Sequence, residues 1–212
     1  MSLKLNGSNS GFTEIDAPAV AGSNTITLPA SNGSANQYLR NSSTAGVLEF
    51  TDGGKILQVL QTVKTDVTSF TSTNSNTFQD ISGMSVSITP TSSSSKILVL
   101  YTANVSQSTT ATIHLRLQRG STSIFQAAAD GNRIGSTQIV RVANTPYEFH
   151  IATVTGSFLD SPSTTSTTTY KLTGTLGSTY SGTFYLNRAK NDLNADYAGR
   201  TASSITVMEV AA

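Results

Sequence analysis

The sequence predicts an all-β protein in which an extended N-terminal segment of short strands precedes a β-sandwich head. Ile113, Leu115 and Leu117 alternate with polar residues, the period of two of a strand with one buried face. After residue 55 such runs recur at regular spacing, which is typical of a sandwich or barrel. Before that point, apolar residues come in twos and threes between Gly, Pro, Asn and Ser. The chain therefore divides into an N-terminal segment, residues 1–52, and a head, residues 55–212.

The N-terminal segment has too few apolar residues to bury a core of its own. Ordering the backbone costs about 1–2 kcal/mol per residue, and two or three apolar side chains per short strand do not offset that cost. We therefore expect the segment to become ordered only against other chains. The glycines of Asp52-Gly53-Gly54 can adopt positive φ, so this tripeptide is a candidate hinge before the head.

The head is predicted to contain ten strands packed as two sheets. Residues 97–101 are apolar on both faces, as expected of a central strand that is covered on both sides. Residues 130–145 and 190–202 lack a sustained period and are predicted to be loops, and loops of this length usually bind a ligand or a neighbouring chain. The ten predicted strands are 56–63, 78–81, 84–88, 97–105, 113–119, 123–127, 147–158, 168–176, 183–187 and 204–210.

Composition excludes several classes of partner and site. Charged residues make up 12% of the chain and the formal net charge is +1, so the field that attracts nucleic acid is absent. The chain has no Cys, so it can form neither a disulfide nor a thiolate metal site. No apolar run approaches the roughly 18 residues of a membrane span, and the first residues lack the features of a secretory signal. We expect no nucleic-acid partner, no membrane insertion and no cofactor.

Candidate catalytic groups are few, and the sequence predicts a protein that is not an enzyme. His114 lies on the polar face of its strand and is interpreted as an ordinary surface or interface residue. His150 shares a strand face with Glu148, for which a cross-strand polar contact is preferred over an acid–base pair. No phosphate-binding glycine loop and no nucleophile elbow is present. No catalytic residue is assigned.

Asp192 and Asp196 form a close carboxylate pair within the predicted loop 190–202. With the neighbouring Asn residues they loosely resemble a calcium loop, which needs three or more oxygen ligands at tight spacing. Turn-forming Asn and Asp are the preferred interpretation, and the calcium alternative stays open. No metal ligand is assigned.

Several stretches carry a likeness to known virion proteins. In the N-terminal segment these are 11–18, 22–29, 33–39 and the Gly-Val-Leu-Glu-Phe of 46–50; in the head they are 56–61, 87–90, 96–99, 116–120 and 205–210. The first set resembles the N-terminal segment of tail-fibre-like virion proteins of marine bacteriophages, cyanophages among them. The second set is similar to the C-terminal knob domains that follow it in those proteins. The resemblance covers essentially the whole chain.

The resemblance implies a trimeric, jelly-roll-like head of the tumour-necrosis-factor or C1q type, with no catalytic residues. It also implies a place on the surface of a virion, after synthesis in the host bacterial cytoplasm. The implied partners are the chain itself, as a homotrimer, and other phage virion proteins of the capsid or tail. Adhesion to a host surface glycan or receptor is left open. Tail fibres are usually far longer, so the short stalk favours a short fibre or a knob.

A homotrimer would give the N-terminal segment two other chains against which to bury its apolar residues. We therefore expect Leu28, Leu39, Leu48 and Phe50 to face the threefold axis or a neighbouring chain.

The alternative function is that of a carbohydrate-binding, lectin-like jelly-roll module. Its candidate ligand residues are Tyr180 and Tyr197, with Asp192 and Asp196 in the same loops. Sugar sites usually present exposed aromatic side chains, and this chain has no Trp and only 7% aromatic residues. The sequence gives this alternative weak support.

Overall fold

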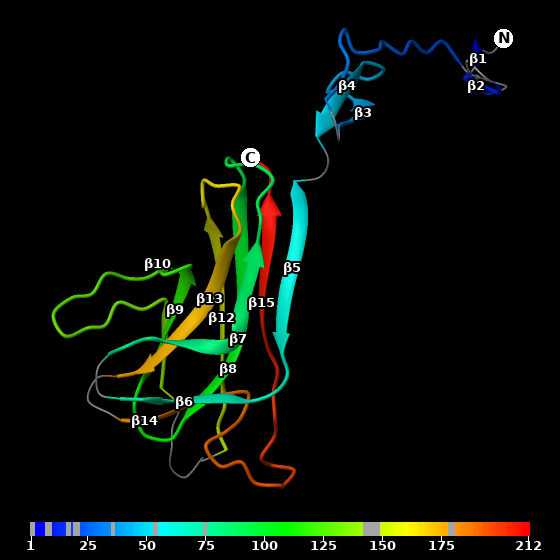
Figure 1. The fold of residues 1–212 in the computed structure, drawn as a ribbon. Helices are drawn as coiled ribbons and strands as arrows, with labels where there is room; N and C mark the ends of the chain where they lie inside the picture. The colour runs from blue at the N-terminus through cyan, green and yellow to red at the C-terminus, as the bar shows by residue number, and fades with distance from the viewer. Residues whose placement is uncertain are drawn as a thin grey trace. The chain divides into compact units, whose positions relative to one another are not determined.

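The all-β prediction is confirmed by the computed structural model, in which no described residue is helical. The structure describes residues 3–6, 10–15, 18, 22–34, 37–52, 55–73, 76–141, 149–177 and 181–212. The chain splits into two compact units, Met1–Gly54 and Lys55–Ala212 (Figure 1). Within the described part of the chain, no helix is long and apolar enough to cross a membrane.

The N-terminal unit consists of two antiparallel hairpins. Strand β1 (Leu3–Asn6) pairs with β2 (Phe12–Ile15), and β3 (Gln37–Asn41) pairs with β4 (Leu48–Asp52). A single parallel bridge joins Thr27 to Val47 beside the second hairpin. No described side chain of this unit is buried. The unit therefore has backbone pairing but no hydrophobic core.

The head is a sandwich of two antiparallel sheets. The six-stranded sheet has the order β5-β15-β8-β14-β6, with β12 also paired to β8; the five-stranded sheet has the order β10-β9-β13-β7, with β11 also paired to β9. Strands that are distant in sequence are paired. The first strand of the head, β5, pairs with the last, β15; β7 pairs with β13; and β8 pairs with β12. Pairing of this kind is typical of a jelly roll. The strands are β5 (Ile56–Lys64), β6 (Thr68–Ser72), β7 (Gln79–Ile88), β8 (Lys96–Gln107), β9 (Ile113–Arg119), β10 (Thr122–Ile124), β11 (Gln138–Val140), β12 (Ala152–Asp160), β13 (Thr168–Leu176), β14 (Gly182–Leu186) and β15 (Ser203–Val210).

The predicted strands 78–81 and 84–88 form one strand, β7, with an irregularity in its middle. Gly83 has φ of +83°, and the pairing of β7 with β13 shifts register at this place. The shift changes which residues face the core, so that Ile81 and Met84 are both buried although they are three positions apart. The alternation of apolar and polar residues is interrupted at the irregularity. The sequence therefore predicts two strands where the structure has one.

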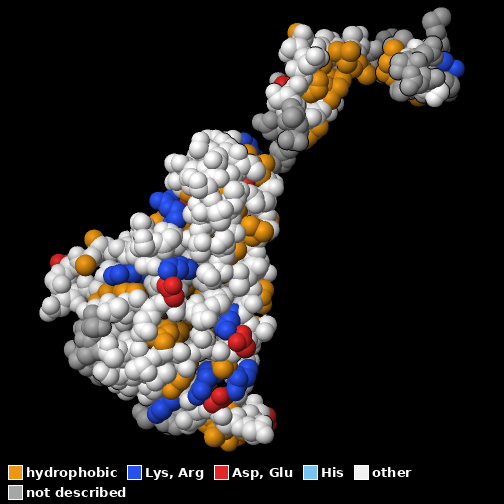
Figure 2. All heavy atoms as spheres, in the orientation of Figure 1, with side chains coloured by type: hydrophobic (Ala, Val, Ile, Leu, Met, Phe, Trp, Pro, Cys, Tyr) orange, Lys and Arg blue, Asp and Glu red, His pale blue; other side chains and the backbone are white. Residues whose placement is uncertain are grey.

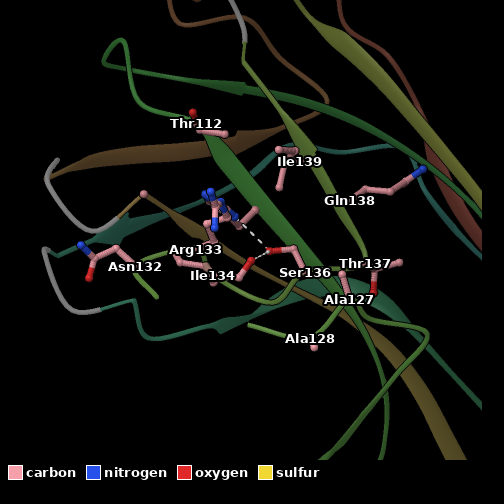
Figure 3. Close-up of a pocket in the computed structure, with 12 residues that line it drawn as sticks. Thr112, Ala127, Ala128, Asn132, Arg133, Ile134, Ser136, Thr137, Gln138 and Ile139 are labelled. Atoms are coloured by element: carbon pink, nitrogen blue, oxygen red, sulfur yellow. Dashed lines mark hydrogen bonds between the residues drawn. The ribbon is translucent and has the colours of Figure 1, made fainter. Parts of the chain in front are cut away.

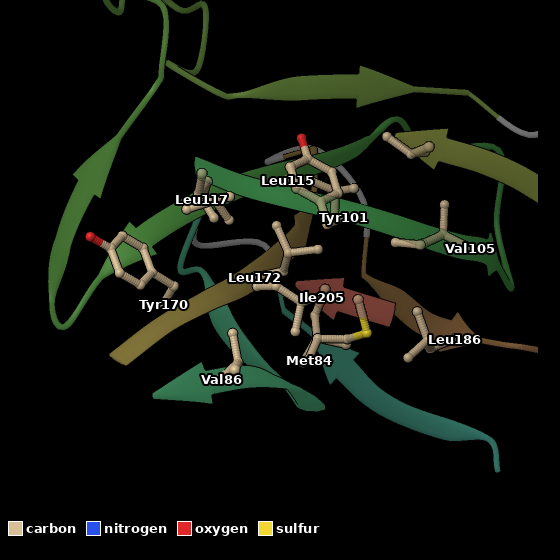
Figure 4. Close-up of a cluster of buried hydrophobic side chains, with 14 of the residues drawn as sticks. Met84, Val86, Tyr101, Val105, Leu115, Leu117, Tyr170, Leu172, Leu186 and Ile205 are labelled. Atoms are coloured by element: carbon tan, nitrogen blue, oxygen red, sulfur yellow. The ribbon is translucent and has the colours of Figure 1, made fainter. Parts of the chain in front are cut away.

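The core lies between the two sheets (Figure 4). Every second residue of β8 and β9 is buried there, as the alternation of β9 predicts. Strand β8 was expected to be covered on both sides, but Leu98 and Leu100 on its other face are only half-buried. The fully buried large side chains are Tyr170, Phe184, Met84, Ile88, Ile97, Ile113, Leu115, Leu117, Leu172, Leu176, Leu186 and Ile205.

Two buried carboxylates fix the ends of strands. Glu209 on β15 accepts hydrogen bonds from Gln58 Nε2 at 2.6 Å and from the backbone NH and the hydroxyl of Thr91 at 2.7 and 2.8 Å. Asp160 at the end of β12 accepts bonds from Arg119 at 2.8 Å and from the Tyr170 hydroxyl at 2.7 Å. Burial, and then the bond to Asp160, raise the pKa of Tyr170. Each carboxylate thus connects segments that are far apart in sequence.

Replacing Leu115 with Ala is expected to lower the free energy of unfolding by about 2–4 kcal/mol, because the side chain is fully buried and the substitution leaves a cavity. Ser85→Ala on the exposed face of β7 is the control and should change the free energy by less than about 0.5 kcal/mol. Urea denaturation of both variants measures this. Similar losses in the two would mean that the alternation is assigned to the wrong faces.

Glu209 should make the head sensitive to acid. Burial alone would raise its pKa, but the bonds from Gln58, Ser95 and Thr91 outweigh burial and hold the pKa at about 2. Because the pKa is lowered on folding, this stabilisation is complete above the ordinary value near 4.5 and is lost as the pH falls toward 2. Glu209→Gln should cost about 1–3 kcal/mol at pH 7, and less at pH 3. Unfolding curves at both pH values test this, and an undiminished gap at pH 3 would contradict it.

Candidate functional site

The outer face of the six-stranded sheet, the side away from the core, carries a row of apolar side chains. The pairing of β5, β15, β8 and β12 aligns Val59, Met208, Leu98 and Leu159 across the four strands. Val59 is 54% exposed and Leu159 is 47% exposed, and the two central members are half-buried. We call the outer face of these four strands the open face.

The next two rows of the open face are also free of charge. One contains Gln61, Thr206, Leu100 and Ser157. The other contains Val63, Ser204, Thr102 and Thr155, and its Val63 is 55% exposed. Removing such a surface from water strips no ion of its hydration, which is the largest cost of burying polar surface. The open face is therefore suited to being covered by protein.

Strand β5 forms an edge of the same sheet, and no second strand pairs with it among the described residues. Leu60 lies opposite Val207, on the core side of the sheet, yet is still 38% exposed. Strand β5 thus shows apolar side chains on both of its faces, and hydrophobic side chains line this edge of the head in Figure 2. Natural proteins protect exposed edges with charges or Pro, and β5 has only Lys64 at its end.

Three of the four predicted contact residues of the N-terminal segment lie on one face of the β3–β4 hairpin. Leu39 is paired directly with Phe50, and Leu48 lies two residues before Phe50 on the same face. The Phe50 ring packs against Gly33, where a Cβ atom would come within 2.6 Å of the ring. Leu28 follows the bridge residue Thr27 and is 69% exposed. Their contact with another chain stays a prediction.

The structure describes three of the four predicted ligand residues of the loops. Tyr180 lies outside the described residues. Tyr197 is exposed and makes an edge contact with the Phe149 ring at 4.9 Å between centroids. Asp192 accepts hydrogen bonds from Arg200 at 2.9 and 2.7 Å, so its charge is balanced by a cation of the chain. Asp196 is exposed.

No group of three or more His, Asp or Glu side chains that could hold a metal ion occurs among the described residues. The Asp192 carboxylate instead forms ion pairs with Arg200 and Arg188, two cations of the chain itself. The calcium interpretation of this loop therefore gains no support, and the turn-forming interpretation of its Asn and Asp residues is preferred.

The two histidines have different surroundings. His150 is exposed, and its predicted neighbour Glu148 lies outside the described residues. His114 is on the polar side of β9, as predicted, but it is half-buried because residues 125–137 fold back over it. Its Nδ1 is 2.9 Å from the hydroxyl oxygen of Ser136, which is buried. Burial, and the nearby Arg116 charge, lower the pKa of His114. No sequence pattern predicts this cover, since Phe125 and Ile134 are the only large apolar residues in 125–137.

Three solved viral structures have a partial likeness to the chain, each at 12% identity. The infectious bursal disease virus Gx strain has a TM-score of 0.39 and the VP2 subviral particle of that virus has 0.38, and each match covers 82% of this chain and 43% of the other. The Gt strain has a TM-score of 0.36, with 98% and 46% covered. The chain spans less than half the length of the chains it matches, and likeness at this level carries no functional argument. No family model and no curated protein matches the chain.

Proposed function

We propose that the chain is a non-enzymatic structural protein of a bacteriophage virion, a short homotrimeric fibre or knob on the particle surface. The observation that carries this proposal is the open face, which has three adjacent rows without a charged residue, one of them an apolar row across four strands. An isolated head would leave this row in water. Burying a Val, Leu or Met side chain completely gains about 1.5–3 kcal/mol relative to full exposure, so covering the row with another copy is favourable.

The two-sided exposure of β5 favours a closed ring of copies over a twofold dimer. In a twofold dimer each copy presents the same patch to its partner. Here the open face lies on one side of β5 and the exposed Leu60 lies on the other, core side. A single flat contact therefore cannot cover both. In a ring, the edge of one head packs against the open face of the next. The resemblance to trimeric virion knobs sets the expected number of copies at three.

The N-terminal unit is the proposed docking segment. Its hairpins have no core, and Leu39 and Phe50 are 44% and 38% exposed on one hairpin face. Hairpins of this kind gain stability when their apolar face packs against a further layer. Residues 1–52 would therefore attach to other virion proteins and to each other, while residues 55–212 project outward.

Val59→Asp should convert the trimer to a monomer, because it places a charge at the exposed β5 end of the apolar row. The control is Ser85→Asp, which adds the same charge to the exposed face of β7 and should stay trimeric. Light scattering measures the mass, which should fall from about three times 22.2 kDa to 22.2 kDa in the Val59 variant alone. A wild-type protein that is monomeric at micromolar concentration would refute the assembly.

Deleting residues 1–52 should leave a folded head that no longer binds virus particles lacking the native protein. The head keeps its core in this truncation, because all the buried hydrophobic residues that the structure describes lie beyond residue 55. Circular dichroism checks the fold, and electron microscopy of decorated particles measures occupancy. Full occupancy by the truncated head would show that the head itself is the docking surface.

A further inference from the structure

The five-stranded sheet carries two adjoining hollows on its outer face, on the opposite side of the head from the open face. Residues 125–137 fold over β9 there, and Asn132, Arg133 and Ile134 line both hollows. One hollow has a volume of about 530 Å³ and contains His114 and Ser136 (Figure 3). The other, of about 560 Å³, contains Arg116.

Arg116 is a half-buried cation without a carboxylate partner among the described residues. Five other arginines, Arg40, Arg119, Arg133, Arg188 and Arg200, each form an ion pair with Asp or Glu, and Arg141 is exposed to solvent. Arg116 instead donates from Nε to the Gly135 carbonyl oxygen at 2.8 Å and stacks on the Phe78 ring at 3.8 Å. Burial lowers the pKa of Arg116, so an anion beside it would be stabilising.

The geometry of Arg116 suits a carboxylate. The backbone carbonyl and the ring hold the guanidinium, and its two terminal nitrogens form no hydrogen bond with a described residue, so they can donate in parallel. Planar, paired N–H donors match the two oxygens of a carboxylate, and a guanidinium held in place loses little entropy on binding.

The neighbouring hollow suits an uncharged, hydroxylated group. The lowered pKa of His114 favours the neutral imidazole at pH 7, and with Nδ1 bonded to Ser136 its Nε2 is the ring nitrogen that can interact with a hydroxyl. Thr112 and Asn132 add further polar groups, while Ala127, Ile134 and Ile139 supply an apolar wall. His114 and Arg116 are two residues apart on one strand face, hence about 7 Å apart along β9. A single sugar ring with its substituents spans that distance.

We propose that these two hollows bind a carboxylate-bearing saccharide unit, with the carboxylate on Arg116 and ring hydroxyls beside His114 and Asn132. Acidic sugars of this chemistry include six-carbon uronates and nine-carbon sialic-type acids. The proposal deepens the virion role, since an outward-facing head would meet the glycans of a cell surface, and it rests on the proposed function only in that respect. The site is within one head and needs no second copy.

The test is isothermal titration calorimetry on the full-length protein with four probes. We expect binding of galacturonate or of N-acetylneuraminate, and which of the two binds identifies the source of the carboxylate. Galactose, the neutral counterpart of galacturonate, should bind at least ten-fold more weakly. Acetate should also bind at least ten-fold more weakly. Equal binding of acetate would show a general anion site and overturn the saccharide, and no binding of either acidic sugar would overturn the site.

Variants tie the binding to the proposed residues. Arg116→Gln should lower the affinity at least ten-fold, and Arg116→Lys should restore it only in part because one ammonium cannot donate in parallel. Asn132→Asp, on an exposed residue that lines both hollows, should repel the ligand with the fold unchanged. Arg200→Gln, far from the hollows in the 190–202 loop, is the control and should bind as the wild type does. Unchanged affinity in both Arg116→Gln and Asn132→Asp would place the ligand elsewhere.

The mass of the same samples separates the two proposals. If a trimer fails to bind acidic sugars, the ligand site is wrong and the assembly stands. If a monomer binds them, the assembly is wrong and the ligand site stands.

Discussion

The central strand β8 has two faces that require different surroundings, and this requirement shapes the rest of the head. One face is fully buried against β9 and β13 of the other sheet, where Val99 and Leu115 contribute to one continuous core. The other face carries Leu98 and Leu100, which nothing in the described part of the chain buries completely. A strand with apolar residues on both faces normally lies inside a layered structure. The described part of the chain supplies two of the layers, and the proposed assembly would supply the third.

Polar interactions hold the sandwich together where its hydrophobic core ends. Glu209 joins β15 to β5 and to the turn around Thr91, and Asp160 joins β12 to β9 and β13. Both carboxylates are almost completely buried, and both accept several hydrogen bonds. A buried carboxylate with this many donors is stable as the anion, and losing any one donor would leave part of the charge unsatisfied. These contacts therefore specify which loop closes on which strand.

The sequence predicted the fold class and most strands because regular alternation reports one buried face directly. It missed β6 and β11, whose Ser- and Thr-rich or very short sequences look like loops until a partner strand is known. It also could not show that residues 125–137 cover His114, because a loop with few apolar residues has no local signal for where it folds. The spacing of Asn and Asp left a calcium site at Asp192 open as an alternative. The partner of Asp192, Arg200, lies eight residues away, and a local pattern does not show that the loop brings the two together.

The two outer surfaces of the head differ in their distribution of charge. The open face has no charged residue in its three central rows, whereas the outer side of the other sheet has Arg116 on β9 and the pair of Lys171 with Asp80 on β13 and β7. A large uncharged face that stays in water lowers the solubility of the protein, and a chain with so few charges has little to offset this loss. The asymmetry is favourable when the uncharged face is covered in the assembly and the charged face stays in solvent. Of these two surfaces, the one with Arg116 is therefore the surface that an assembled head can offer to a soluble ligand.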